Sequence, residues 1–454
     1  MITFSLTAAA RTMIGQLAGA DAIFTGVSTD SRTLRTGELF VALQGERHDG
    51  HDAIALAHAA GATGAVIDRP LNTTLPTVRV GNTRRALGQL AHAWRACHNL
   101  PVIGVTGSSG KTTTKEMITA ILRQDVDVLA TMGNLNNDIG VPLTLFRLAL
   151  EHRAAVIEMG ANGMRDIAEL VEIAQPTIGL VTMCGPAHLQ GFGSIEQVAE
   201  AKGAIYQQLG PSGLAVLNAD DQFCHYWRRR TDAGRVLTFG ITEKADYYAE
   251  NIRLRDLGQG SEFDLCAPEG RIRIRLPLEG RHNIRNALAA AAAALHAGSN
   301  LEAVAAGLGQ SSPVNGRLNV RTGLRGCVII DDTSNANPAS LAAALSVLAG
   351  YPARRWLVLG DMAELGSVEH AEHLAAGLLA RQQGVERLFT LGTLSHDAVS
   401  SFGTDAVHYP DRASLVAALQ RDVREDIAIL IKGSRVMQLE KVVDALVTQS
   451  ETTC

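Results

Sequence analysis

The sequence predicts an α/β protein with three domains. The chain has 454 residues, which is too long for one hydrophobic core. Short apolar runs alternate with helix-like spacing of apolar residues, as expected for largely parallel sheets covered by helices. Pro- or Gly-containing connectors interrupt this alternation near 99–101 and 311–318. We therefore expect a small α/β domain, a central domain with a mostly parallel sheet and a Rossmann-like domain, at 1–98, 99–313 and 314–454.

The composition narrows the class of protein. Hydrophobic residues make up 46% and charged residues 19%, a balance typical of soluble globular proteins. The net charge of −5 argues against a nucleic-acid protein that binds mainly through phosphate contacts. The six cysteines lack CxxC spacing and indicate free thiols in a reducing compartment. No apolar run is long enough to span a membrane, so we expect a cytoplasmic protein. We also expect the protein to be a monomer.

Residues 1–98 contain strand-like runs at 39–43 and 64–67, with helical spacing at 9–17 and, further on, at 54–60 and 84–98. Polar loops at 28–32 and 44–51 lie next to these strands. Such loops are usually solvated turns. The alternative is an anion or sugar site built from hydroxyls, Arg32 and backbone N–H groups, and spacing leaves both open.

Residues 102–115 form the most informative stretch. An apolar run is followed by a Gly/Ser turn, a lysine, hydroxyls and a helical pattern, which is typical of a nucleotide phosphate site. Lys111 would reach the β/γ-phosphates, and Thr112 would offer its hydroxyl to Mg²⁺. Val105 stands where the strict motif has its first glycine, so Gly107 makes the turn in a shortened P-loop. A plain Gly-rich turn capped by Ser or Thr is the less favoured alternative.

Further polar residues follow apolar runs in the central domain, where ligands of parallel sheets bind. Glu158 ends one run and suits Mg²⁺, although a solvated or helix-capping carboxylate is the alternative. His188 and Lys202, taken alone, are typical of a structural histidine and a surface lysine. Asn283 and Asn286 share one face of a helix start and suit an adenine edge, or simple N-capping. The strand-like runs of this domain are 102–105, 126–130, 155–158, 178–183, 215–218 and 236–239.

The last domain repeats strand–helix spacing and predicts a Rossmann-like open sheet. No Gly-x-Gly-x-x-Gly follows its first strand, so a dinucleotide site is not supported. Polar stretches at 331–338, 360–366 and 432–435 stand at predicted strand ends. The predicted strands are 327–331, 356–359, 388–391 and 427–431, and the helices 338–348, 368–382, 412–419 and 436–447.

Together and in order, these stretches resemble the Mur ligase family of ATP-dependent amide-bond-forming enzymes over nearly the whole chain. The P-loop at 106–113 is shared across that family. The paired asparagines after Gly133, Asn-Ala-Asn-Pro at 335–338 and Gly-Asp-Met-Ala-Glu-Leu-Gly at 360–366 are most similar to members that add D-alanyl-D-alanine to UDP-N-acetylmuramoyl-tripeptide. The other matching stretches are 158–160, 185–189, 201–203, 282–286 and 432–435.

The resemblance implies a carboxylate activated by ATP as an acyl phosphate, with two Mg²⁺ ions. Thr112 and Glu158 would hold one Mg²⁺ and His188 the second. Lys202 matches the family lysine that CO₂ converts to a carbamate, which would supply an oxygen ligand. Lys111, Glu158, His188 and Lys202 are thus the implied catalytic set. ATP phosphates would lie on Gly107, Ser108, Ser109, Gly110, Lys111, Thr112 and Thr113.

The remaining implied roles concern binding. Asn283 and Asn286 would meet the adenine, and Arg317 and Asp332 would contact ATP as the C-terminal domain closes. The UDP-sugar and peptide would meet Ser31, Arg32, Gly45, His48, Asn136, Asn137, Asn335 and Asn337.

One position departs from the family pattern, because Ser334 stands where the family usually has Tyr, while Thr333 keeps a hydroxyl. Three alternatives remain beside the D-alanyl-D-alanine reaction: a family member adding a single amino acid, a P-loop NTPase switch, and a non-catalytic nucleotide-binding scaffold. The residues leave open whether diaminopimelate or lysine is third in the peptide.

Overall fold

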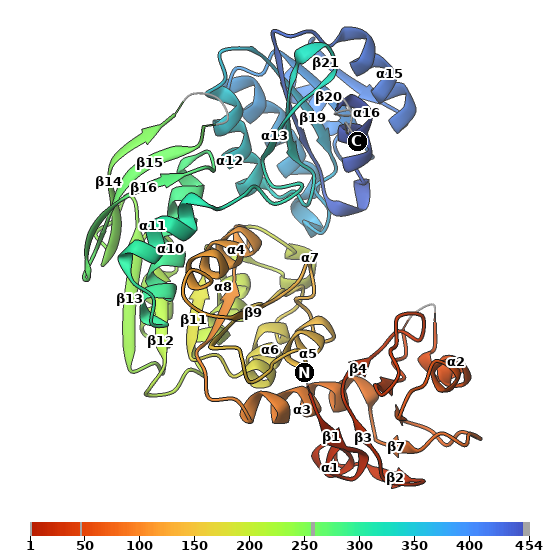
Figure 1. Cartoon of the computed structure of the whole chain (residues 1–454). Helices are drawn as coiled ribbons and strands as arrows, with labels where there is room; N and C mark the ends of the chain where they lie inside the picture. Colours follow the sequence, from red (N-terminus) through yellow and green to blue (C-terminus); the bar gives the residue numbers. More distant parts are fainter. Residues whose placement is uncertain (1, 46–47, 256–258, 448–454) are drawn as a thin grey trace, which may run out of the picture.

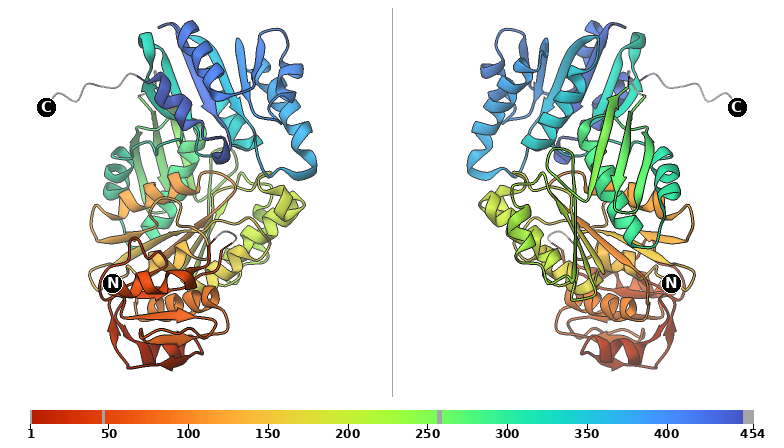
Figure 2. Two further views of the ribbon diagram at one scale, coloured as in Figure 1. Left: turned by 90° about the vertical axis from the view of Figure 1, so that its right-hand side faces the viewer. Right: turned by 90° about the vertical axis from the view of Figure 1, so that its left-hand side faces the viewer.

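The computed structural model describes residues 2–45, 48–255 and 259–447. Three large sheets follow one another along the molecule, with the N-terminal part at one end, the central part between and the C-terminal part at the other end (Figures 1 and 2). The predicted three-domain α/β architecture is confirmed. No helix among these residues is both long and apolar enough to cross a membrane.

The N-terminal domain holds a five-stranded sheet that is parallel except for its first strand. The predicted helix at 9–17 is wrong in its second half: α1 (Leu6–Thr12) stops early, and residues 16–18 form a strand. Ile14 takes a left-handed φ of 54°, which ends the helix. In sheet order the strands are β2 (Gln16–Ala18), β7 (Thr77–Arg79), β6 (Gly64–Ile67), β5 (Leu39–Val41) and β4 (Val27–Ser28); β1 (Phe4–Ser5) pairs with β3 (Ile23–Phe24), and the other helices are α2 (Ile54–Ala59) and α3 (Thr83–Ala96).

The central sheet has nine strands, and β9 through β14 in its spatial order run parallel. The three strands at 247–254, 261–267 and 270–276 were not predicted from the sequence, and the last two of them join the sheet by antiparallel pairing. In order the strands are β9 (Val128–Ala130), β10 (Ala154–Glu158), β8 (Val102–Thr106), β11 (Ile178–Val181), β12 (Leu214–Asn218), β13 (Arg235–Gly240), β14 (Tyr247–Leu254), β15 (Ser261–Ala267) and β16 (Gly270–Leu276).

Helices cover both faces of this sheet, because alternate residues of each strand enter different cores. Val102 packs in a core that continues into α1 and α3, whereas its neighbour Ile103 packs under α4 and α10. The helices are α4 (Lys111–Leu122), α5 (Gly140–Leu145), α6 (Asp166–Ala174), α7 (Leu189–Phe192), α8 (Ile195–Gly203), α9 (Cys224–Arg228), α10 (Arg281–His296) and α11 (Leu301–Gly309).

Helix α10 positions part of the site. Its alanines from Ala287 to Ala294 are buried, and the helix packs on α4, which begins at Lys111. Small side chains allow two helices to approach closely. The first turns of α10, with Asn283 and Asn286, therefore lie beside the P-loop.

The C-terminal sheet has six strands and is parallel except at one edge, as a Rossmann-like sheet is. The predicted helix at 436–447 is shorter, since Gln438 takes a φ of 50° before the helix begins. In order the strands are β17 (Asn319–Thr322), β18 (Val328–Asp332), β22 (Ile427–Lys432), β19 (Arg354–Gly360), β20 (Arg387–Leu391) and β21 (Ala406–Tyr409); the helices are α12 (Pro338–Ala349), α13 (Glu369–Gln382), α14 (Asp397–Phe402), α15 (Arg412–Asp422) and α16 (Glu440–Leu446).

Candidate active site

The P-loop joins the end of β8 to the start of α4. Gly107 and Gly110 have φ angles of 147° and 82°, which L side chains rarely adopt. A Cβ on Gly107 would lie 1.9 Å from Oγ1 of Thr182, and one on Gly110 would lie 2.7 Å from Oδ1 of Asn286. Both positions therefore require glycine, for conformation and for space.

Lys111 folds back over this loop, and its Nζ donates to the carbonyl oxygen of Gly107 at 2.8 Å. Burial lowers the pKa of Lys111; nearby Glu158 opposes the shift and Arg317 adds to it. The hydroxyl of Ser108 already has a partner outside the loop, since it donates to the carbonyl oxygen of Gly185 at 2.9 Å. The arrangement leaves backbone N–H groups and the lysine available for phosphate oxygens.

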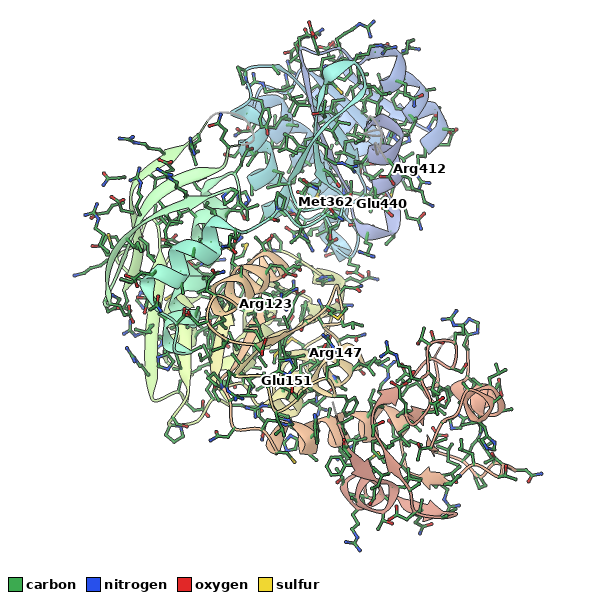
Figure 3. All side chains as sticks on the ribbon, viewed as in Figure 1. Arg123, Arg147, Glu151, Met362, Arg412 and Glu440 are labelled. Atoms are coloured by element: carbon green, nitrogen blue, oxygen red, sulfur yellow. The ribbon has the colours of Figure 1, made fainter. Side chains whose placement is uncertain are left out.

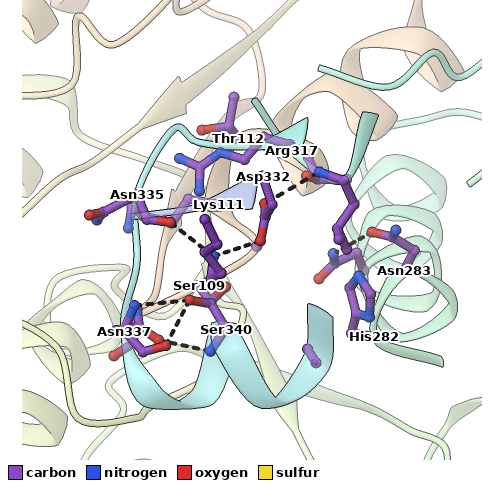
Figure 4. Close-up of a pocket in the computed structure, with 17 residues that line it drawn as sticks. Ser109, Lys111, Thr112, His282, Asn283, Arg317, Asp332, Asn335, Asn337 and Ser340 are labelled. Carbon is purple, nitrogen blue, oxygen red and sulfur yellow. Dashed lines mark hydrogen bonds and ion pairs between the residues drawn. The ribbon is translucent and has the colours of Figure 1, made fainter. Parts of the chain in front are cut away.

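A cavity surrounds the loop and is closed from the far side by the C-terminal domain (Figure 4). It joins residues that are more than two hundred positions apart in the sequence. Gly107 does not line this cavity, and its carbonyl holds Lys111 instead. The predicted residues that line it are Ser108, Ser109, Gly110, Lys111, Thr112, Thr113, Asn283, Asn286, Arg317, Asp332, Asn335 and Asn337.

Two further residues of this cavity were given no role from the sequence. Lys432 is buried at the end of β22, and its Nζ donates to Oδ2 of Asp332 at 2.6 Å and to the carbonyl oxygen of Asn335 at 2.9 Å. The side chain of His282 faces the same cavity, and desolvation lowers its pKa to about 4. Both residues lie in stretches that match the family, 282–286 and 432–435, and Lys432 also stands at a predicted strand end.

Several of the asparagines have structural partners. Asn283 donates through Nδ2 to the carbonyl oxygen of Glu279 at 2.8 Å and accepts from Asn286 at 3.2 Å. Asn337 caps α12, accepting from the backbone of Ser340 at 2.9 Å. Oδ1 of Asn137 likewise accepts from the N–H of Gly140 at 2.8 Å. Asn283 and Asn337 thus shape the cavity walls as well as lining them.

A second cavity of about 550 Å³ continues from the first and shares Lys111, Thr112 and Arg317 with it. Asn136 and Glu158 meet in its wall, where Nδ2 of Asn136 donates to Oε1 of Glu158 at 2.8 Å. The other predicted residues that line it are Asn137, His188, Asn335 and Asn337.

The donors in this region fit a magnesium ion that also binds phosphate. Oε2 of Glu158 is buried and has no hydrogen-bond partner among the described residues. Among the described residues, no three His, Cys, Asp or Glu side chains are close enough together to hold a metal ion without other ligands. Mg²⁺ commonly takes one or two protein carboxylates and completes its shell with phosphate and water. Glu158 and Thr112 both line the second cavity, and their oxygens would supply such a partial shell.

His188 and Lys202 are not the ordinary residues that their sequence context favoured. His188 follows β11 and bonds to Glu364 of the C-terminal domain. Lys202 is 1% exposed, with Nζ 5.7 Å from the ring centroid of Phe192. Burial, together with the charge of Lys111, lowers the pKa of Lys202 to about 7. A buried amine with a pKa of about 7 has a substantial neutral fraction at pH 7, which fits a lysine that reacts with CO₂.

The N-terminal residues predicted for the UDP-sugar line neither of these two cavities. Arg32 pairs with Asp30 in a fork, with Nη2–Oδ2 and Nε–Oδ1 distances of 2.7 and 2.9 Å, and Ser31 lies in the same turn. The N–H of Gly45 donates to the carbonyl oxygen of His48 at 2.9 Å. Residues 46–47 of this loop lie outside the described residues. These four residues therefore lie in two polar loops of the N-terminal domain, outside both cavities.

Comparison with known proteins gives the same family in all three parts of the chain. The models "Mur ligase family, catalytic domain", "Mur ligase middle domain" and "Mur ligase, glutamate ligase domain" match residues 23–95, 105–294 and 316–435. The UDP-N-acetylmuramoyl-tripeptide--D-alanyl-D-alanine ligase of Escherichia coli (strain K12) is 43% identical over 457 residues, covering 100% of both chains.

Comparison with solved structures supports the same family. MurF from Acinetobacter baumannii superposes with a TM-score of 0.92 at 35% identity, covering 98% of each chain. The MurF ligase from Thermotoga maritima in complex with ADP gives 0.82 at 28% identity, with 92% of this chain and 96% of that chain covered. This chain therefore belongs to the Mur ligase family.

Proposed function

We propose that this protein is the ATP-dependent ligase that joins D-alanyl-D-alanine to UDP-N-acetylmuramoyl-tripeptide, giving the pentapeptide precursor of peptidoglycan. The observation that carries the proposal is the pair of adjoining cavities, one around the P-loop and one large enough for two peptide ends, which share Lys111, Thr112 and Arg317. The full-length relatives named for this reaction support the same choice of substrates.

The chemistry follows from where the charges lie. The terminal carboxylate of the tripeptide attacks the γ-phosphate, ADP leaves, and the amine of D-alanyl-D-alanine then displaces phosphate from the acyl phosphate. Lys111 and Arg317 stand where the cavities meet and stabilise the negative charge between carboxylate and phosphate. Two Mg²⁺ ions, held by Thr112 and Glu158 and by His188 and a Lys202 carbamate, would neutralise further charge. Closure of the C-terminal domain keeps water from the acyl phosphate.

The proposal extends to the outer parts of the chain. Asn283 and Asn286 meet the adenine, while Asn136, Asn137, Asn335 and Asn337 line the path of the peptide. Ser31, Arg32, Gly45 and His48 hold the UDP-sugar at the N-terminal edge. The domains are 1–98, 99–313 and 314–454. The setting is the cytoplasm, which suits ATP and the free thiols of the five described cysteines, and the protein acts as a monomer.

The deciding experiment measures ADP and amide product together, with each substrate omitted in turn. We expect release of ADP to require both UDP-N-acetylmuramoyl-tripeptide and D-alanyl-D-alanine, with one amide bond formed per ADP. ADP release without either acceptor would instead identify a nucleotide-driven switch. Amide formation with single amino acids but not with the dipeptide would identify another member of the family. Parallel reactions with diaminopimelate- and lysine-containing tripeptides assign the third residue.

Lys202 offers a separate test of the metal assignment. Lys202→Ala removes the amine that reacts with CO₂, so activity should fall to background. A short carboxylic acid in the buffer supplies a replacement oxygen ligand and should restore part of it. Full activity of Lys202→Ala would remove the carbamate from the mechanism.

A further inference from the structure

We propose that Glu364, on the C-terminal domain, is a positioning residue for His188, on the central domain, and that domain closure makes this contact. The metal-binding role of His188 comes from the proposed function, whereas the contact itself is independent of it. Both residues line the second cavity. Met362, two residues before Glu364, lies on the side of the C-terminal domain that faces the central domain (Figure 3).

Glu364 contacts the central domain through its side chain and its backbone. Its carboxylate accepts a hydrogen bond from Nδ1 of His188, and its carbonyl oxygen accepts one from the N–H of Gln190 at 3.1 Å. A Cβ on Gly366 would lie 3.2 Å from Cα of Gln190, so the two main chains approach closely here. The contact therefore joins two loops from different domains, 176 residues apart.

The loop that presents Glu364 is held rigidly. The three residues before it are each tied to other parts of the C-terminal domain, and Glu364 itself has a left-handed φ of 64°. Non-glycine residues adopt this conformation at a cost that the surrounding structure must offset. The bonds are Leu394 N–H and Ser395 N–H to Oδ1 of Asp361 at 3.0 and 2.7 Å, Met362 N–H to Nε2 of His373 at 2.9 Å, and Ala363 N–H to Oγ of Ser434 at 2.8 Å.

The central domain leaves the His188 ring without support of its own. Glu364 is the only hydrogen-bond partner of this ring within the described residues. His188 also has a left-handed backbone, with a φ of 55°. A carboxylate on Nδ1 keeps the proton on that nitrogen and leaves the lone pair of Nε2 for a cation. Closing the domains therefore completes the histidine site as well as covering the cleft.

The test compares Glu364→Gln with Glu425→Gln, an exposed glutamate in the turn before β22. Hydrogen exchange of the 188–193 segment is measured first, without metal or nucleotide. We expect Glu364→Gln to exchange several-fold faster there, because Gln190 loses protection when the contact loosens, and Glu425→Gln to match the wild type. Wild-type exchange in Glu364→Gln would overturn the contact, even if the protein proved not to be a ligase.

The second readout is the Mg²⁺ concentration that gives half-maximal ligation. Loss of a carboxylate behind a metal-binding histidine typically costs 10–100-fold. We expect the half-saturating Mg²⁺ concentration to rise by about that factor in Glu364→Gln, with little change in the KM for ATP. Glu364→Asp keeps the charge on a shorter arm and should recover part of the loss. An unchanged Mg²⁺ requirement in Glu364→Gln would refute the positioning role.

Discussion

Asp332 and Lys432 are directly opposite one another at the ends of the parallel strands β18 and β22, with Oδ2 and Nζ 2.6 Å apart. Both side chains are buried, with 9% of the Asp332 side chain and 1% of the Lys432 side chain exposed. Burial lowers the pKa of Lys432, and the Asp332 carboxylate opposes this shift. The pair therefore holds two charges that neither residue would tolerate alone.

Lys432→Met should destabilise the protein by about 3–5 kcal/mol, because it leaves the Asp332 carboxylate buried without its partner. Urea unfolding at pH 7 measures the free energy of unfolding. Lys441→Met removes an exposed lysine of α16 and serves as the control, with an expected change below about 0.5 kcal/mol. Equal free energies of unfolding for Lys432→Met and the wild type would contradict the role of the pair.

Gly107→Ala should abolish nucleotide binding, because the new methyl group would lie 1.9 Å from Oγ1 of Thr182 and force the loop out of shape. Gly298→Ala is the matched control: its φ is also positive, at 106°, and nothing lies within 4 Å of the added Cβ. It bears the conformational strain without the collision. Calorimetric titration with ADP should show binding by Gly298→Ala and none by Gly107→Ala. Comparable affinities would show that the loop adapts.

His282 should make stability depend on pH. Desolvation lowers its folded pKa to about 4, with Arg285 and Lys432 adding to the shift and Asp332 opposing it. Between pH 6.5 and 4 the unfolded chain therefore binds a proton that the folded chain excludes, so stability falls as pH falls through this window. Because the ring is partly exposed, we expect about 1–2 kcal/mol.

His282→Gln removes the titrating group, and urea unfolding across this range should show a shallower slope than the wild type. His225→Gln, at an exposed position in α9 and outside both cavities, serves as the control. Parallel stability curves for His282→Gln and the wild type would show that the ring is protonated normally.

The sequence predicted a structural element correctly where the local pattern of residues determines its conformation. The run 102–106 is buried on both faces, as a strand covered on both sides must be, and the glycines after it can adopt the positive φ angles that the turn requires. The strands β14 to β16 were missed for a related reason. Residues 270–276 alternate arginine with apolar residues, which is the pattern of a half-solvated strand, but they contain none of the continuous apolar runs from which the other strands were predicted.

Contacts between distant residues carried no local signal. Lys202 has the spacing of an ordinary helical lysine, and only the packing of α8 against α6 and α7 makes it buried. Asp332 and Lys432 are 100 positions apart, and a strand order that places β22 beside β18 cannot be derived from spacing. His188 and Glu364 meet only because two domains face each other. The family resemblance supplied roles for Lys202, Asp332 and His188, but not the partners that hold them.

Glu158→Gln should separate catalysis from stability. The amide keeps the size of the side chain and an Oε1 that still accepts from Asn136, but it removes the charge on Oε2, which is buried without a partner among the described residues. Loss of this buried charge relieves its desolvation but also removes its attraction for nearby Lys111, so the free energy of unfolding should stay within about 1 kcal/mol of the wild-type value. The ligation rate should fall by about 10²–10³-fold, because the charge proposed to bind Mg²⁺ is lost.

Glu151→Gln, at an exposed position before β10, controls for the loss of a glutamate charge alone (Figure 3). The two measurements are kcat at saturating Mg²⁺ and the urea midpoint of the metal-free protein. If Glu158 served only the fold, Glu158→Gln would lose stability and activity together. If the unpaired oxygen of Glu158 binds the metal, Glu158→Gln should be about as stable as the wild type and yet slow at every Mg²⁺ concentration.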